Sequence, residues 1–74
     1  MKKFSMNSMF RDVIEDERVV EILNQNFPML LTNPRVSEAY DYTLKEIISD
    51  DMGAVVGIPK SVIKKVFNQI VELD

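Results

Sequence analysis

The stretch IPKSVIKKVFNQIVEL, residues 58–73, decides the fold class of this 74-residue chain. Its apolar side chains recur at the i, i+3, i+4, i+7 spacing of one helix face: Ile63, Val66, Phe67 and Ile70. Lysine, asparagine and glutamine take the opposite face, and Pro59 precedes the run as a helix-start residue. The stretch therefore predicts a long amphipathic helix, running to about Leu73, whose apolar face other elements must cover.

Upstream, helix signals alternate with helix breakers. Asn7 or Ser8 can cap a first helix that contains Phe10, Val13 and Ile14, and Asp16 can cap a second. Pro28 disfavours helix at the preceding residue and should end that second helix. No window alternates apolar and polar residues over several positions, so no strand is predicted.

The middle of the chain carries three further start signals. Asn33-Pro34 combines a capping asparagine with proline at the first helical position. Thr43 and Glu46 have the spacing of a capping box. The segment Ser49-Asp50-Asp51 can cap one more turn, which Gly57 is placed to end in a left-handed conformation.

These signals predict an all-α fold, a compact bundle of five or six short helices that ends in a long amphipathic C-terminal helix. Residues 1–74 form a single small helical domain, with residues 1–5 expected as a loose tail. The short apolar run Met29-Leu30-Leu31 lies close behind Pro28 and should plug the core from a turn.

The composition excludes most catalytic chemistry. The chain contains no histidine, no cysteine and no tryptophan. It therefore lacks an imidazole base, a thiolate nucleophile and the usual zinc ligands. We expect no enzymatic activity, no catalytic residue, no metal site and no cofactor.

Two motifs that could suggest chemistry have simpler explanations. The acidic residues around the first helix junction lack a visible apolar cleft and are expected to form a capped, solvated face: Asp12, Glu15, Asp16, Glu17 and Glu21. The small acidic composition invites comparison with acyl carrier proteins, but no serine stands in the Asp-Ser-Leu context that carries their prosthetic arm.

The net charge of −3 argues against a nucleic-acid partner, because a duplex binder usually presents a basic face. Lys60, Lys64 and Lys65 form the one short basic stretch and are expected on a solvated helix face. No apolar run approaches the length of a membrane span, so no membrane insertion is expected. The sequence favours a cytoplasmic protein, and the lack of cysteine fits a reducing compartment.

Several apolar and aromatic side chains are candidates for an interaction surface. Tyrosine is enriched at interfaces, and methionine makes adaptable ones. One tyrosine of the pair at 40 and 42 is expected to pack inward. The candidate interaction residues are Met29, Leu30, Tyr40, Tyr42 and Met52.

The order of these dipeptides also resembles a known module. Phe4-Ser5-Met6-Asn7-Ser8, Phe27-Pro28, Asn33-Pro34-Arg35-Val36, Tyr42-Thr43-Leu44-Lys45-Glu46-Ile47 and Ile58-Pro59 span almost the whole chain. The set resembles the small helical module of uncharacterised function at the C-terminus of some bacterial β-glucosidases and esterases. It is similar, more loosely, to other small bacterial helical domains of unknown function. The resemblance implies an all-α accessory module without catalytic residues of its own.

The leading hypothesis is a non-enzymatic helical domain that packs on a partner protein or on itself. The partner would be a bacterial hydrolase if the chain is an excised piece. One alternative is a module that binds a small apolar ligand between the last helix and the turn at residues 29–31, which requires a preformed pocket. A weaker alternative is contact with nucleic acid or a membrane surface through the three lysines of the last helix.

Overall fold

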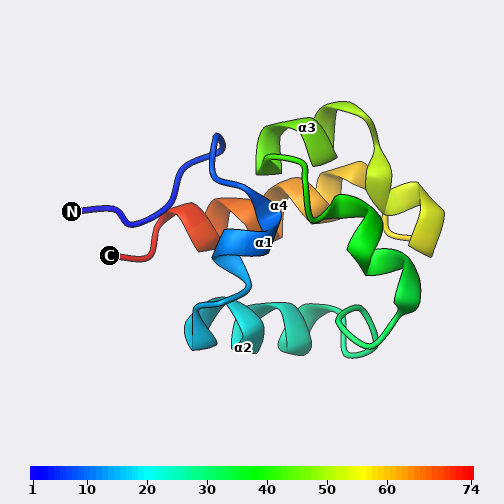
Figure 1. Cartoon of the computed structure of the whole chain (residues 1–74), viewed down its shortest axis with the longest axis horizontal. Coiled ribbons are helices and arrows are strands. Elements are labelled where there is room, and N and C mark those ends of the chain that lie inside the picture. Colours follow the sequence, from blue (N-terminus) through cyan, green and yellow to red (C-terminus); the bar gives the residue numbers. More distant parts are fainter.

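The computed structural model describes all 74 residues and has four α-helices and two 3₁₀ helices (Figure 1). They follow in the order α1 (Phe10–Val13), α2 (Glu17–Asn26), η1 (Pro34–Ala39), α3 (Leu44–Ser49), η2 (Met52–Val56) and α4 (Lys60–Val71). An isolated bridge between Met9 and Thr43 is the sole β interaction. The predicted all-α fold with five or six helices is confirmed.

The C-terminal helix α4 organises the molecule. Figure 1 shows it crossing the centre, with α2 on one side and α3 on the other. Both of these helices and η2 contact it directly. Its four predicted inward residues are all buried, because they carry the helix's apolar face into the core: Ile63, Val66, Phe67 and Ile70. The helix ends at Val71, two residues before the predicted end.

The core is small and continuous. It contains eleven buried hydrophobic side chains: Phe10, Val13, Val19, Leu23, Val36, Leu44, Ile47, Ile63, Val66, Phe67 and Ile70. No polar or charged side chain is buried with them. A second set of fourteen apolar side chains lies half-buried against this core. The two sets together contain most of the chain's apolar residues, which make up 46% of the sequence.

Local hydrogen bonds confirm three of the predicted helix starts. The Asp16 carboxylate accepts from the Arg18 amide at 2.8 Å, and the Asn33 side chain accepts from the Arg35 amide at 2.9 Å. The capping box is complete. The Thr43 amide donates to the Glu46 carboxylate, and the Glu46 amide donates to the Thr43 hydroxyl oxygen. α2 ends at Asn26, two residues before Pro28, as predicted.

Two predicted caps are wrong. Met9, rather than Asn7 or Ser8, precedes α1, and the Ser8 hydroxyl instead accepts from the Ser5 amide in the preceding turn. Asp51 precedes η2 without a side-chain cap. Its φ of 51° is left-handed, and a capping side chain normally requires an extended backbone at that position.

The turn after α2 differs in part from the expected plug. Leu30 and Leu31 are half-buried and pack against the core. Met29 does not, because 74% of its surface remains exposed. The turn therefore supplies two core contacts and leaves one large apolar side chain in solvent.

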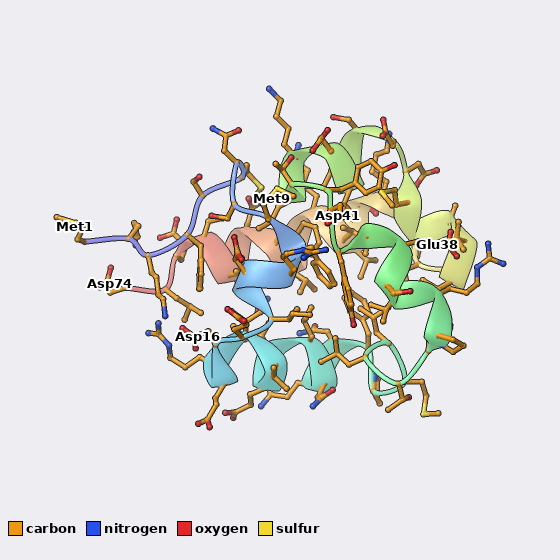
Figure 2. All side chains as sticks on the ribbon, in the orientation of Figure 1. Met1, Met9, Asp16, Glu38, Asp41 and Asp74 are labelled. Atoms are coloured by element: carbon orange, nitrogen blue, oxygen red, sulfur yellow. The ribbon has the colours of Figure 1, made fainter.

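The chain ends lie beside each other (Figure 2). The Lys3 amide donates to the Leu73 carbonyl at 3.3 Å, and the Lys2 ammonium lies 3.0 Å from the Glu72 carboxylate. The Lys3 ammonium also reaches the Asp16 carboxylate at 3.2 Å. Residues 2 and 3 thus contact both the C-terminal segment and the start of α2.

Asp16 is the most strongly perturbed acid in the molecule. Hydrogen bonds from the Arg18 side chain and amide, with a further one from Lys3, hold the pKa of the Asp16 carboxyl well below its usual range. The carboxylate is therefore favoured in the fold, and the folded chain binds fewer protons than the unfolded one. The stability that Asp16 contributes is complete above the unfolded pKa of about 3.9 and is lost as the pH falls below it.

We expect Asp16→Asn to lower stability at pH 7 and to have a progressively smaller effect as the pH falls from 4 to 2. Asparagine can still cap α2, so the substitution removes mainly the charge. Urea unfolding of both proteins between pH 7 and pH 2 measures the difference. Asp12→Asn is the matched control, because Asp12 is exposed and makes no ion pair. A difference that persisted unchanged at pH 2 would contradict this linkage.

Candidate functional site

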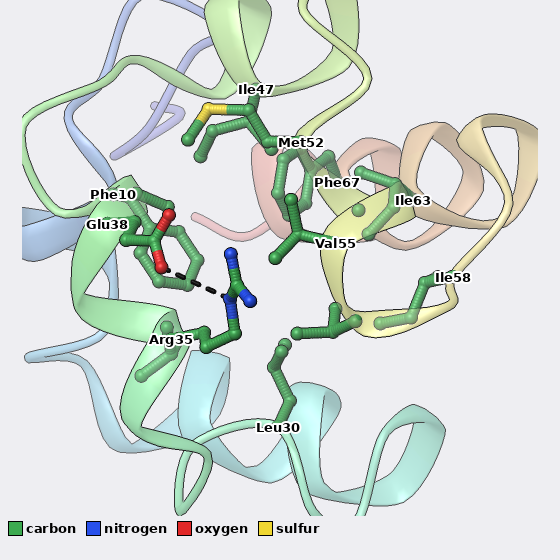
Figure 3. A pocket seen from close by; sticks show the side chains of 14 residues that line it. Phe10, Leu30, Arg35, Glu38, Ile47, Met52, Val55, Ile58, Ile63 and Phe67 are labelled. Atoms are coloured by element: carbon green, nitrogen blue, oxygen red, sulfur yellow. Dashed lines mark ion pairs between the residues drawn. The ribbon is translucent and has the colours of Figure 1, made fainter.

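An apolar pocket opens between η1, η2, α3 and the first half of α4. Eleven of its fourteen lining residues are hydrophobic, and its volume is about 60 Å³. We call it the anchor pocket (Figure 3). Phe10, Ile47 and Phe67 belong to the core and form the inner wall, Leu30 lines the pocket from the turn after α2, and Val55 is half exposed at its edge.

The wall on the η1 side follows from its sequence. Asn33 caps the helix, and Pro34 sets its first turn. Val36 is then buried in the core, while Ala39 also lines the pocket. Because alanine ends at Cβ, this position leaves space that a larger side chain would occupy.

The opposite wall depends on a close approach of η2 to α4. A Cβ atom on Gly53 would lie 2.8 Å from the Ile58 carbonyl oxygen and 2.9 Å from Cγ1 of Ile63. The Gly53 carbonyl in turn accepts from the Ile58 amide at 2.8 Å. Gly57 ends η2 with a φ of 78°, which confirms the predicted left-handed stop.

The two glycines should differ in their response to alanine. Gly53→Ala is expected to cost about 1–3 kcal/mol, because the new Cβ meets a backbone atom that cannot rotate away. Gly57→Ala should cost about 1 kcal/mol, since the backbone is strained but nothing lies within 4 Å of the new atom. Chemical denaturation of both variants measures the difference. A Gly53→Ala protein as stable as the parent would contradict the close approach.

One ion pair lies at the mouth of the pocket. Nε of Arg35 is 3.2 Å from a Glu38 carboxylate oxygen, and the side chains are 57% and 55% exposed. No buried side-chain nitrogen or oxygen lacks a hydrogen-bond partner anywhere in the structure. The pocket thus offers an apolar interior and a charged rim, with no unpaired buried polar group inside.

A second, more open hollow adjoins the anchor pocket. It has a volume of about 230 Å³ and shares Leu30, Val56 and Ile58 with the anchor pocket. The turn that follows α2 supplies most of the rest, including Met29. We call it the side hollow. The two together form one apolar face at the end of the molecule away from the chain termini.

The structure distributes the five sequence-predicted interaction residues over different places. Leu30 and Met52 line the anchor pocket, and Met29 lines the side hollow. Tyr40 packs inward, its ring centroid 6.3 Å from that of Phe10. Tyr42 is exposed and lines neither hollow. The prediction that one tyrosine of the pair packs inward agrees with this arrangement.

Sequence reasoning did not single out Val55 as a residue of the candidate site. It is 50% exposed and lies at the edge of the anchor pocket. A signal was present, since Ala54, Val55 and Val56 are three consecutive apolar residues in one short turn. A single turn cannot direct three neighbouring side chains into the same core, so one of them had to face solvent.

The other candidate groups remain at the surface. Lys60, Lys64 and Lys65 are exposed on α4 and make no ion pair. No three acidic side chains gather closely enough to hold a metal ion. None of the helices has both the length and the apolar character needed to cross a membrane.

Comparison of the chain with protein-family models, with curated proteins and with solved structures finds no match in any of the three. Of the resemblance described from the sequence, the structure supports the coarse part. The chain is a small, compact helical domain with a radius of gyration of 11.0 Å.

Proposed function

We propose that this chain is a non-enzymatic protein-interaction domain whose anchor pocket holds one apolar side chain of a partner protein. The observation that carries the proposal is the pocket itself, an apolar cavity that opens to solvent beside the exposed Val55. Binding energy at interfaces concentrates in a few anchor side chains that fill such pockets. The exposed Met29 and the side hollow extend the contact area beyond the anchor.

The size of the pocket favours a side chain over a free ligand. Sites for drug-sized molecules measure about 300–1,000 Å³, and a dry cavity of about 150 Å³ takes benzene. A volume of about 60 Å³ suits one aliphatic side chain. The small apolar ligand is the second candidate, because Leu30, Ile63 and Phe67 place this pocket between α4 and the turn where the sequence suggested such a site.

The accessible surface favours a partner that binds reversibly. The chain exposes 4675 Å², and a folded monomer of this mass is expected to expose about 4,700 Å². Few large apolar side chains are exposed to solvent. They are Met1, Met29, Tyr42, Val55 and Val62. This supports a modest interface around one anchor and gives little support to an extensive permanent one.

The resemblance to the accessory module of bacterial β-glucosidases and esterases suggests one class of partner. On that reading, the anchor side chain would belong to a hydrolase. The proposal does not depend on this identification, because it rests on the shape and chemistry of the pocket. A homo-oligomer would use the same face, with the anchor supplied by a second copy.

A matched pair of variants tests the proposal. Val55→Asp places a charge at the pocket edge, whereas Val62→Asp places the same charge on an exposed valine of α4 that lines neither hollow. Both are first shown by circular dichroism to be folded. Immobilised wild-type and variant proteins are then compared for retention of proteins from the source lysate, and for self-association by sedimentation.

The expected result is a partner retained by the wild type and by Val62→Asp but lost from Val55→Asp. Retention that is equal for both variants would place the interface elsewhere. A wild type that retains no protein and stays monomeric at high concentration would contradict the proposal itself.

A further inference from the structure

The ion pair at the mouth of the anchor pocket leaves part of a guanidinium group free. The ion pair between Glu38 and Arg35 is made at Nε, and neither Nη atom of Arg35 makes a hydrogen bond within the chain. Figure 3 shows the guanidinium lying across the pocket mouth, between Glu38 and Val55. A ligand whose apolar part enters the pocket would therefore bring its outer part to the Nη edge of Arg35.

The chemistry of that edge selects an anion. Two parallel N–H groups of a guanidinium match the two oxygens of a carboxylate. Because Glu38 lies on the Nε side, the opposite edge of the guanidinium is left for a second carboxylate. One ligand can satisfy both the pocket and this edge only if its apolar side chain and its carboxylate are attached close together.

We infer that the anchor pocket recognises the C-terminal residue of a partner polypeptide, with the apolar terminal side chain in the pocket and the terminal carboxylate on Arg35. In a terminal residue the side chain and the carboxylate share one Cα atom, so a single residue meets both requirements. This inference rests on the proposed function and names the segment of the partner that binds.

The side hollow favours a polypeptide over a free organic acid. It continues from the anchor pocket across Leu30, Val56 and Ile58 and is lined mainly by apolar residues. The residues that precede the terminal one have an apolar surface there on which to lie. A free acid would leave the side hollow empty.

The test is a titration of the full chain, labelled with ¹⁵N, followed by two-dimensional NMR. One probe is an acetylated peptide of three alanines and a C-terminal leucine with a free carboxylate. The second is the same peptide with a C-terminal amide, and the third is 4-methylpentanoate. NMR detects the millimolar affinities expected of so small a contact.

The expected result is that the free carboxylate improves peptide affinity by up to about fivefold over the amide, the upper end of what an exposed ion pair contributes. Amide signals of Val55 and Ile63 should shift. Arg35→Gln should abolish this preference, while Lys45→Gln, an equal change of charge outside the pocket, should retain it. Added salt should reduce the preference.

Three results would overturn the inference. Equal affinity for both peptides, with shifts at the pocket, would remove the carboxylate contact and leave the proposed function intact. Shifts that avoid the pocket with both peptides would count against the proposed function as well. Affinity for 4-methylpentanoate equal to that of the free-carboxylate peptide would make the occupant a small acid.

Discussion

Replacing Leu23 with alanine is expected to lower the free energy of unfolding by about 2–5 kcal/mol. Leu23 lies in α2 with none of its surface exposed, and α2 packs directly on α4. The truncation removes three buried carbon atoms from the contact between the two longest helices. A chain of 74 residues has a total stability of about 4–11 kcal/mol, so the loss is a large share of it.

The measurement is chemical denaturation followed by circular dichroism. Ile22→Ala is the matched control, because it removes the same number of carbon atoms from the neighbouring, half-buried position of α2. It should cost about 1 kcal/mol, since less apolar surface is lost from the interior. Equal costs at the two positions would mean that the α2–α4 contact is not the centre of the core.

Elements that depend on neighbours in the sequence could be predicted without a structure. The capping box of Thr43 and Glu46, the Asn33 cap and the left-handed stop at Gly57 each involve residues only a few positions apart. Their geometry follows from local hydrogen bonds and backbone preference. The amphipathic spacing of α4 likewise identified the residues that it buries.

Features that depend on long-range packing could not be predicted in the same way. The anchor pocket needs Leu30, Arg35, Met52 and Phe67 to converge from four separate segments. Its narrow wall arises because Gly53 approaches the Ile58 carbonyl, and glycine in a sequence does not say what it will contact. For the same reason, Leu30 and Met52 could be named as candidates, but their meeting at one pocket could not.

The second large effect concerns the anchor pocket. Ala39→Leu is expected to reduce partner or peptide binding at least tenfold while raising the melting temperature by several degrees. Ala39 lines the cavity, and the added carbon atoms would occupy much of its space of about 60 Å³. Each buried methylene contributes about 0.8 kcal/mol, and cavity-filling substitutions commonly stabilise by about 0.5–2 kcal/mol.

A loss of binding together with a gain in melting temperature distinguishes a binding pocket from a space that serves only packing. If the space were needed only for folding, filling it would change stability and leave binding unchanged. If the substitution simply distorted the fold, binding and melting temperature would fall together. Thermal denaturation and the NMR titration on the same protein separate these cases.

Ala54→Leu is the control, because Ala54 is an exposed residue of η2 that lines neither hollow. A rise in stability with full binding would exclude the anchor pocket as the contact site, since a pocket already filled by Leu at position 39 could not receive a partner's side chain.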